Sequence, residues 1–213
     1  MHRLRLKFSR GENLKFLSHL DLMRLWERAL RRAGMPPAYS EGFSPHPKIS
    51  LAAPLPVGVT STAEIMDIFL GGRITPAVLV QRLAPQLPEG IAIIDVIAVG
   101  LQAPSLQSRV RMAEYLVEVK PGGNVQPVEE AIASLLGKET LAWHHARDTG
   151  ERYYDLRVLI EDIWLESKSD TTCHIGMRLR CGATGSGRPE QVARALGFED
   201  IPISIERTKL IFD

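Results

Sequence analysis

The order of strand and helix patterns constrains the fold of this chain more than any other feature, because the same order occurs twice. Residues 3–8 alternate strictly between basic and apolar side chains, which indicates a half-buried strand. A helix pattern follows over residues 18–34, with Ser18 as its capping residue and Gly34 as its stop. Strand, strand, helix and strand patterns complete the first half, over residues 49–53, 63–70, 75–83 and 91–99.

The second half repeats this order, βαββαβ, with one extra strand and a period of about 105 residues. Such an order is typical of the ferredoxin-like fold, whose antiparallel sheet carries both helices on one face and leaves the other face free. The sequence therefore predicts an α+β protein of two tandem ferredoxin-like (βαββαβ) halves with antiparallel sheets, residues 1–100 and 110–213, joined by a linker at 101–109. Strand patterns in the second half cover 110–120, 140–145, 153–165 as one long or broken strand, 172–181 and 203–211, and helix patterns cover 127–136 and 189–196.

The composition is that of a protein with a packed core. The chain has 213 residues, of which 45% are hydrophobic and 24% are charged. No apolar run approaches the roughly 20 residues that span a bilayer, and no signal peptide is evident, so we expect a cytoplasmic protein without membrane association. The two cysteines, Cys173 and Cys181, form no CxxC pair, and no cluster of His, Asp or Glu has metal-ligand spacing. We therefore expect no metal and no cofactor in this chain.

The net charge of +1 hides an asymmetry between the two ends. Residues 1–48 carry ten Lys and Arg against four Asp and Glu, or +6, and the remainder carries 16 against 21, or −5. A basic region on a nearly neutral protein favours an anionic partner such as RNA, although an ordinary solvated surface would look the same. Part of this charge lies on the outer face of the helix pattern over 18–34, which carries Arg24, Glu27, Arg28, Arg31 and Arg32.

Two predicted strands place cations on the free face of their sheets. Arg3, Arg5 and Lys7 share one face of the first strand, and Arg178 and Arg180 share one face of the strand over 172–181. Because the first strand has no aromatic residue on that face, we expect contacts with an RNA backbone rather than stacking on bases.

The alternative for these cations is pairing with acidic residues on neighbouring strands. Asp67 could pair with Arg5, and Glu114 and Glu118 could pair with the two arginines of the second half. The sequence leaves both interpretations open.

A glycine-rich stretch, "GATGSGRPEQ", follows the strand over 172–181 and precedes a helix pattern. Free backbone N–H groups of Gly185 and Gly187, with Arg188 beside them, could bind a phosphate at the start of that helix. The stretch matches neither the phosphate loop of nucleotide hydrolases nor the dinucleotide fingerprint. A flexible turn between strand and helix would need no ligand.

A proline-rich loop, "YSEGFSPHPKIS", contains the remaining candidates. Two prolines restrict the backbone around His46, so we expect the loop to hold His46 and Lys48 rigidly, close to Ser18 and His19 at the helix start. These residues could contact phosphates. His19, His46 and Tyr39 could instead supply an acid and a base for RNA cleavage without a metal.

The motifs "FLSHLDLMR", "EGFSPHPKIS" and "PLPVGV" resemble the radical-SAM-linked family, an uncharacterised domain fused to or encoded beside B12-binding radical SAM proteins. The resemblance is long over residues 14–61 and looser over the rest. It implies a radical SAM partner that carries the iron–sulfur cluster, SAM and cobalamin. Family members are also encoded near a ribonuclease E/G-type enzyme and ribosomal proteins, which implies RNA or the ribosome as substrate. A weaker likeness is to CRISPR-associated RNA-processing endonucleases.

Three functions follow as hypotheses. The leading one is a non-catalytic RNA-binding or substrate-presenting accessory module that works with a separate radical SAM enzyme in the modification of RNA or the ribosome. In that role the chain itself is not expected to be an enzyme. The alternatives are a metal-free endonuclease using His19 and His46, and a protein-binding adaptor that docks through the apolar run "LAAPLPVGV" without nucleic acid.

Overall fold

The computed structural model describes residues 1–121, 127–147, 150–182 and 185–213, and residues 145–147 and 152 by their backbone only. It is a mixed α+β fold whose strands are mostly antiparallel. Two compact units divide the chain, the first made of residues 1–110 with Asp213 and the second of residues 111–212.

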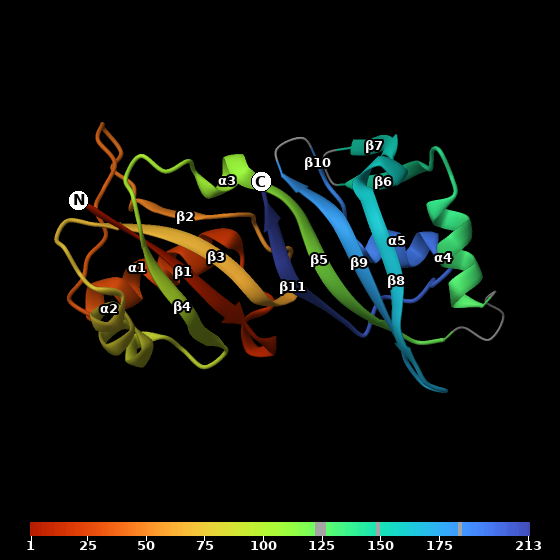
Figure 1. Ribbon diagram of the computed structural model, residues 1–213, viewed down its shortest axis with the longest axis horizontal. Coiled ribbons are helices and arrows are strands. Elements are labelled where there is room, and N and C mark those ends of the chain that lie inside the picture. Colours follow the sequence, from red (N-terminus) through yellow and green to blue (C-terminus); the bar gives the residue numbers. More distant parts are fainter. Residues whose placement is uncertain (122–126, 148–149, 183–184) are drawn as a thin grey trace. The chain divides into compact units, whose positions relative to one another are not determined.

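The sheet of the first unit has the strand order β4-β1-β3-β2. β1 (His2–Arg10) lies between β3 (Thr60–Leu70) and β4 (Ile91–Val99) and is antiparallel to both. β2 (Ile49–Leu51) pairs antiparallel with one end of β3. The helices of this unit are α1 (His19–Arg32), α2 (Pro76–Leu83) and the short α3 (Leu106–Arg109), as Figure 1 shows, with 3-10 turns at Glu12–Leu14 and Ala84–Gln86.

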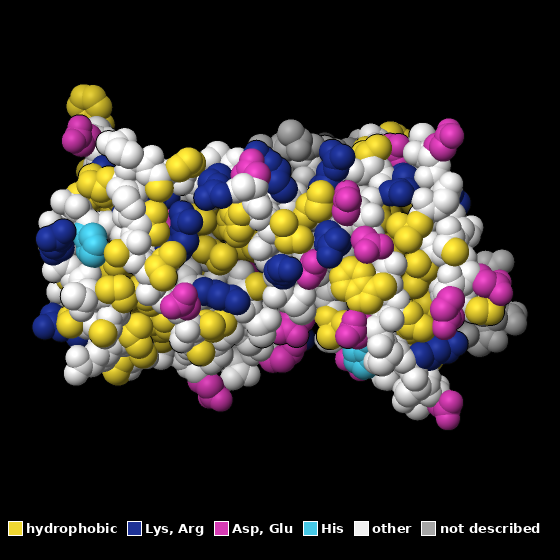
Figure 2. All heavy atoms as spheres, viewed as in Figure 1, with side chains coloured by type: hydrophobic (Ala, Val, Ile, Leu, Met, Phe, Trp, Pro, Cys, Tyr) yellow, Lys and Arg dark blue, Asp and Glu magenta, His cyan; other side chains and the backbone are white. Residues whose placement is uncertain are grey.

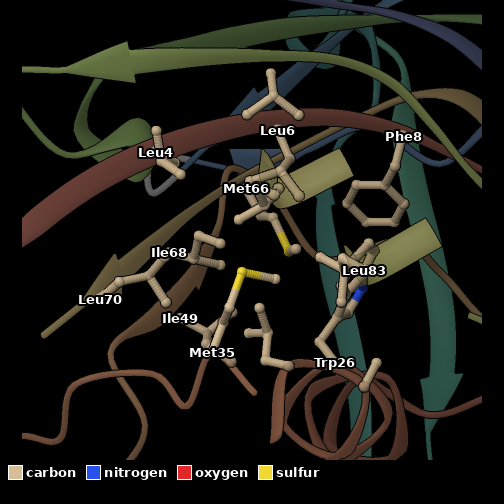
Figure 3. Close-up of a cluster of buried hydrophobic side chains, with 14 of the residues drawn as sticks. Leu4, Leu6, Phe8, Trp26, Met35, Ile49, Met66, Ile68, Leu70 and Leu83 are labelled. Carbon is tan, nitrogen blue, oxygen red and sulfur yellow. The ribbon is translucent and has the colours of Figure 1, made fainter. Parts of the chain in front are cut away.

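The core of the first unit lies between the apolar face of β1 and the helices. Leu4, Leu6 and Phe8 point the same way because side chains alternate along a strand, and all three are fully buried. The ring of Phe8 meets Trp26 of α1 edge-on, with centroids 4.8 Å apart. Figure 3 shows these side chains meeting those of α1, α2 and β3 in one cluster. The apolar half of the predicted first strand therefore forms the core as expected.

The capping signals that delimit α1 in the sequence also operate in the structure. The Ser18 hydroxyl accepts a hydrogen bond from the backbone N–H of Asp21, which satisfies one of the free donors at the helix start. At the other end Gly34 adopts φ of 70°, a left-handed conformation that glycine reaches without steric cost. The chain consequently turns sharply away after α1.

The sheet of the second unit has the order β8-β9-β5-β11, with the two-residue β10 added beside β9. β9 pairs antiparallel with both β5 and β8, and β6 and β7 form a separate two-stranded sheet. The strands are β5 (Val110–Val119), β6 (Ala142–Arg147), β7 (Gly150–Asp155), β8 (Ile160–Lys168), β9 (Cys173–Gly182), β10 (Gly185–Ser186) and β11 (Ser204–Phe212); the helices are α4 (Val128–Leu136) and α5 (Pro189–Ala195), with a 3-10 turn at Arg157–Leu159.

The structure adds two details to the expected chain path. The pattern over 153–165, predicted as one long or broken strand, is broken into β7 and β8, because Asp155 accepts hydrogen bonds from the backbone N–H groups of Leu141 and Arg157 and turns the chain there. The segment 101–109, predicted to be a linker, belongs to the first unit and contains α3. Leu106 of α3 is buried, so this segment is packed onto its unit.

Candidate nucleic-acid interface

The arginines of β1 are engaged in a buried ion cluster and are not free on a sheet face. Arg3 is only 3% exposed and Asp67, which lies on β3, is 1% exposed. The Arg3 guanidinium donates to Asp67 Oδ2 at 2.5 Å, and Arg5 Nε donates to Asp67 Oδ1 at 2.8 Å. Of the two interpretations of these cations, the structure shows the pairing with Asp67, which the strand register produces because Arg5 stands directly opposite Asp67.

The segment after β4 explains why Arg3 is the more deeply buried of the two. Arg3 also donates to the backbone carbonyls of Ala103 at 2.5 Å and Pro104 at 2.9 Å. A guanidinium has five donors, so Arg3 can satisfy both carbonyls together with Asp67. Lys7, further along β1, stays exposed on the same face, with Ile65 and Asp95 opposite it.

The cations on β9 differ from one another. Arg178 donates to Glu114 Oε1 through Nε at 2.9 Å and Nη2 at 2.8 Å, and the two residues are directly opposite in the register. Arg180 is exposed and stands opposite Met112, and Glu118 instead accepts a hydrogen bond from Ser204 at 2.9 Å. Figure 2 shows the result on the viewed face, where basic side chains are interspersed with acidic and hydrophobic ones.

The described part of the glycine-rich stretch pairs with β9, because Gly185 and Ser186 form β10 antiparallel to it. Gly187 N–H donates to the carbonyl of Arg180 at 2.9 Å, so that amide is not free for an anion. A Cβ on Gly187 would lie 2.9 Å from Leu179 Cβ, which gives this glycine a packing role. Gly185 has a positive φ of 141°, which favours glycine, and Arg188 lies 3.6 Å from the carboxylate of Glu190. Ala183 and Thr184 of this stretch lie outside the described residues.

The proline loop lies at the end of α1 opposite to His19. Tyr39 OH donates to Glu27 Oε1 at 2.6 Å, and Glu27 lies about 12 Å along the helix axis from His19. His46 is tied to this side, because its N–H donates to Ser40 Oγ at 2.9 Å and its carbonyl accepts from Ser40 N–H at 2.8 Å. The expectation that His46 lies near His19 is thus wrong, and the two cannot act as one acid–base pair.

The backbone explains this placement. After the turn at Gly34, the chain pairs with the end of β3, where Ala38 N–H donates to the Phe69 carbonyl and Phe69 N–H donates to the Lys48 carbonyl. Lys48 and the loop are consequently fixed beside the last turn of α1. Two prolines next to His46 restrict the return path but do not set its direction.

The outer face of α1 carries a group of arginines that sequence reasoning noted but did not assign to a site. Arg24, Arg28 and Arg31 follow one another at four- and three-residue spacing, which places them on one helix face. With Glu27 they line a hollow of about 210 Å³. The signal in the sequence is the spacing itself, which is equally that of an ordinary solvent-exposed helix face.

Charge pairing within this group is incomplete. Arg31 Nη2 lies 2.9 Å from Glu27 Oε1 and also donates to the Tyr39 hydroxyl, and the hydrogen bond to Tyr39 is the main cause that raises the pKa of Arg31 above its ordinary value. Arg24 lies 3.5 Å from Asp21, with both side chains more than half exposed. Arg28 makes no hydrogen bond or ion pair with any residue in the described ranges.

The apolar run "LAAPLPVGV" is mostly unavailable for docking. Leu51, Ala52, Leu55 and Val59 are each less than a tenth exposed, whereas Val57 is open to solvent. In the part of the chain that the structure describes, no three His, Cys, Asp or Glu residues could hold a metal ion together. None of the described helices is both long and apolar enough to cross a membrane.

Residues 3–189 match the family described as "Uncharacterized protein conserved in bacteria (DUF2344)". The chain belongs to this family. No curated protein matches it.

Comparison with solved structures finds chains similar to this one. One is a chain of a Cbf5-Nop10-Gar1 complex, at 10% identity and a TM-score of 0.50 over 98% of the present chain. The present chain spans 48% of the length of that chain. A second is an unknown protein from Galdieria sulphuraria, at 13% identity and a TM-score of 0.28, with 92% of this chain and 89% of that chain covered. A third is the acetolactate synthase small subunit from Thermotoga maritima, at 12% identity and a TM-score of 0.27, with 100% of this chain and 96% of that chain covered.

Proposed function

We propose that this protein is a non-catalytic module that binds single-stranded RNA, with the phosphate backbone lying along the outer face of α1. The observation that carries the proposal is the hollow lined by Arg24, Arg28 and Arg31, in which Arg28 has no partner among the described residues. A guanidinium without a carboxylate partner can offer its planar set of donors to a phosphate.

Electrostatics support an anionic ligand at this face. Three arginines outnumber the two carboxylates beside them, Asp21 and Glu27, and the Glu27 carboxylate already accepts bonds from Arg31 and Tyr39. The last turn of α1 also carries the negative end of the helix dipole, equivalent to about half a charge. Because each guanidinium carries a full charge, the local potential remains positive.

The fold is compatible with this role. Both units carry the order of four strands that results from a βαββαβ connection, β4-β1-β3-β2 in the first and β11-β5-β9-β8 in the second. We interpret the units as tandem ferredoxin-like halves, an architecture that RNA-recognition modules share. The binding surface proposed here is a helix face, because Arg3 and Arg5 on the sheet are already paired with Asp67.

The accessory role is the second part of the proposal, and it rests on the resemblance of residues 14–61 to the radical-SAM-linked family. The module would present RNA to a separate B12-binding radical SAM enzyme, which would supply the iron–sulfur cluster, SAM and cobalamin. Purification of the tagged protein from its native host, after gentle crosslinking, should recover that enzyme together with RNA. Recovery of RNA without it would remove the accessory role and leave RNA binding in place.

Salt dependence tests the RNA site. Affinity for a labelled 12-nucleotide single-stranded RNA, measured by fluorescence anisotropy from low to moderate salt, should fall steeply because phosphate contacts release counterions. Each lost phosphate contact reduces the slope of log affinity against log salt by about 0.7 for a single strand. Arg28→Ala should reduce this slope by about 0.7, and the double variant Arg24→Ala/Arg28→Ala should reduce it by about twice that amount.

Arg82→Ala is the matched control, because Arg82 is also an exposed arginine near the end of a helix of the first unit, on α2. It should leave the slope unchanged. No binding of the wild-type protein at low salt would overturn the proposal, as would equal slopes for the wild type and the double variant.

A further inference from the structure

The loop between α1 and β2 is closed at its base and projects Phe43 into solvent. Ser40 and His46 exchange the hydrogen bonds described above, and Tyr39 and Pro47 form an isolated bridge just below them. We call residues 40–46 the finger. It projects from the first unit in Figure 1, drawn in orange, and a hydrophobic side chain forms its tip in Figure 2. Phe43 has a relative exposure of 111%, the largest among the exposed hydrophobic residues of the described chain.

The construction of the finger limits its freedom. Besides the closed base, Pro45 and Pro47 restrict the backbone on the return side, and Gly42 takes a positive φ of 118° directly before Phe43. A ligand that contacts Phe43 therefore meets a side chain whose backbone is already partly ordered, which lowers the entropy lost on binding.

The surroundings of the finger indicate which ligand suits Phe43. Tyr39, at the base, is hydrogen-bonded to Arg31 on the arginine face of α1. Phe43 is four residues from Tyr39, within about 14 Å even for a fully extended chain. A partner that covers both features needs negative charge for the arginines and a flat apolar surface for the phenyl ring. Single-stranded nucleic acid has both, since its phosphates and exposed bases alternate along the strand.

We propose that Phe43 stacks on a base of the single-stranded RNA whose phosphates lie along Arg24, Arg28 and Arg31. This inference rests on the function proposed above and specifies the form of RNA: unpaired bases are needed, because the bases of a duplex are stacked on each other. Stacking on an aromatic side chain tolerates any base, so the contact strengthens binding without reading sequence.

Trp164 on β8 is a less suitable platform. A Cβ on Gly176 would lie 2.0 Å from the Trp164 indole, so one face of the indole is already packed against the backbone of β9. Its Nε1–H donates to Glu166 at 2.8 Å, and Glu114 and Asp162 stand opposite Arg178 nearby. Those carboxylates would repel a phosphate backbone.

The test compares Phe43→Ala with Phe16→Ala, because Phe16 is also strongly exposed, at 72%, and lies before α1 at the other end of the helix. Three labelled probes of equal length are used with the full chain: a single-stranded RNA, an abasic strand with the same phosphates, and an RNA duplex. The wild type should bind the single strand about tenfold more tightly than the abasic strand, as expected for one stacked base.

Phe43→Ala should lose this preference for bases while keeping the salt slope of the wild type, and its affinity for the abasic strand and the duplex should not change. Phe16→Ala should behave as the wild type. Arg28→Ala should keep the preference for bases, and its log affinity should depend less steeply on log salt. Unchanged melting temperatures verify that the variants are folded, as expected for side chains in solvent.

Two outcomes overturn the inference, and they differ from each other. If Phe43→Ala keeps the wild-type preference for bases while Arg28→Ala weakens binding, then stacking is wrong and RNA binding by α1 stands. If the wild type binds none of the three probes at low salt, both proposals fail. In that case, loss of a co-purifying protein on Phe43→Ala would assign the finger to a protein partner.

Discussion

Arginines on the strands and arginines on α1 differ in what stands opposite them. In the sheet, the residue across from each cation is set by the register, so Arg5 meets Asp67 and Arg178 meets Glu114 at hydrogen-bonding distance. On the helix, neighbours occur only three or four residues away along the surface, and Arg28 finds no carboxylate there among the described residues. Arg3, Arg5 and Arg178 on the strands thus serve the fold, whereas Arg28 on the helix has no protein partner among the described residues.

The two groups of arginines also differ in burial. Arg3 and Asp67 lie in an environment where losing a partner leaves an uncompensated charge, whereas Arg24, Arg28 and Arg31 are exposed and screened by water. Substitutions in the two regions should therefore separate by their effects on stability and on binding.

The largest effect is expected for Asp67→Asn. It removes the charge that both Arg3 and Arg5 pair with and should reduce the free energy of unfolding by about 3 kcal/mol, as breaking a buried ion pair does. Urea denaturation followed by circular dichroism measures this change. Asp21→Asn, on the exposed part of α1, is the control and should cost much less; equal losses in the two variants would break the comparison.

An intermediate effect is expected for Glu114→Gln. Arg178 is 37% exposed and Glu114 is 15% exposed in their side chains, so the pair is partly screened by solvent. Its loss should lower the free energy of unfolding by about 1 kcal/mol. Repeating the denaturation in 1 M salt should shrink the difference from the wild type, and a difference that grows with salt would contradict the assignment.

The smallest effect on stability is expected for Arg28→Ala. Because Arg28 has no partner among the described residues and alanine has a high helix propensity, the free energy of unfolding should change by less than about 0.5 kcal/mol. The same variant should lose RNA affinity and salt slope. A loss of stability above 1 kcal/mol would instead give Arg28 a structural role.

Local patterns predicted most of the secondary structure. The alternation over residues 3–8 and the capping by Ser18 and Gly34 depend only on neighbouring residues, and β1 and α1 appear where these patterns place them. For residues 153–165 the local pattern left one long strand and a broken one open, because the break depends on the Asp155 side chain accepting a hydrogen bond from Leu141, 14 positions earlier in the chain.

The candidate site was less accessible to sequence reasoning. Arg3 looked free because nothing local reveals that residues 103 and 104 pack over it, a hundred positions further along the chain. His46 looked close to His19 because a loop that leaves a helix can return to either end. The hydrogen bonds that Phe69 accepts from Ala38 and donates to Lys48 select the end near Tyr39, and no pattern in the loop encodes that choice.

By itself, the sequence determined the order of elements, the apolar faces that form the core and the helix bearing the arginines, since periodicity and capping act over a few residues. Tertiary structure decided which of the cations are neutralised. A guanidinium is available or not according to whether a carboxylate or a buried carbonyl comes within about 3 Å of it, and that depends on strand register and on segments far apart in the chain. In this protein, the donors of Arg3 are occupied by Asp67 and by the carbonyls of residues 103 and 104, while Arg28 lies open on the exposed face of α1.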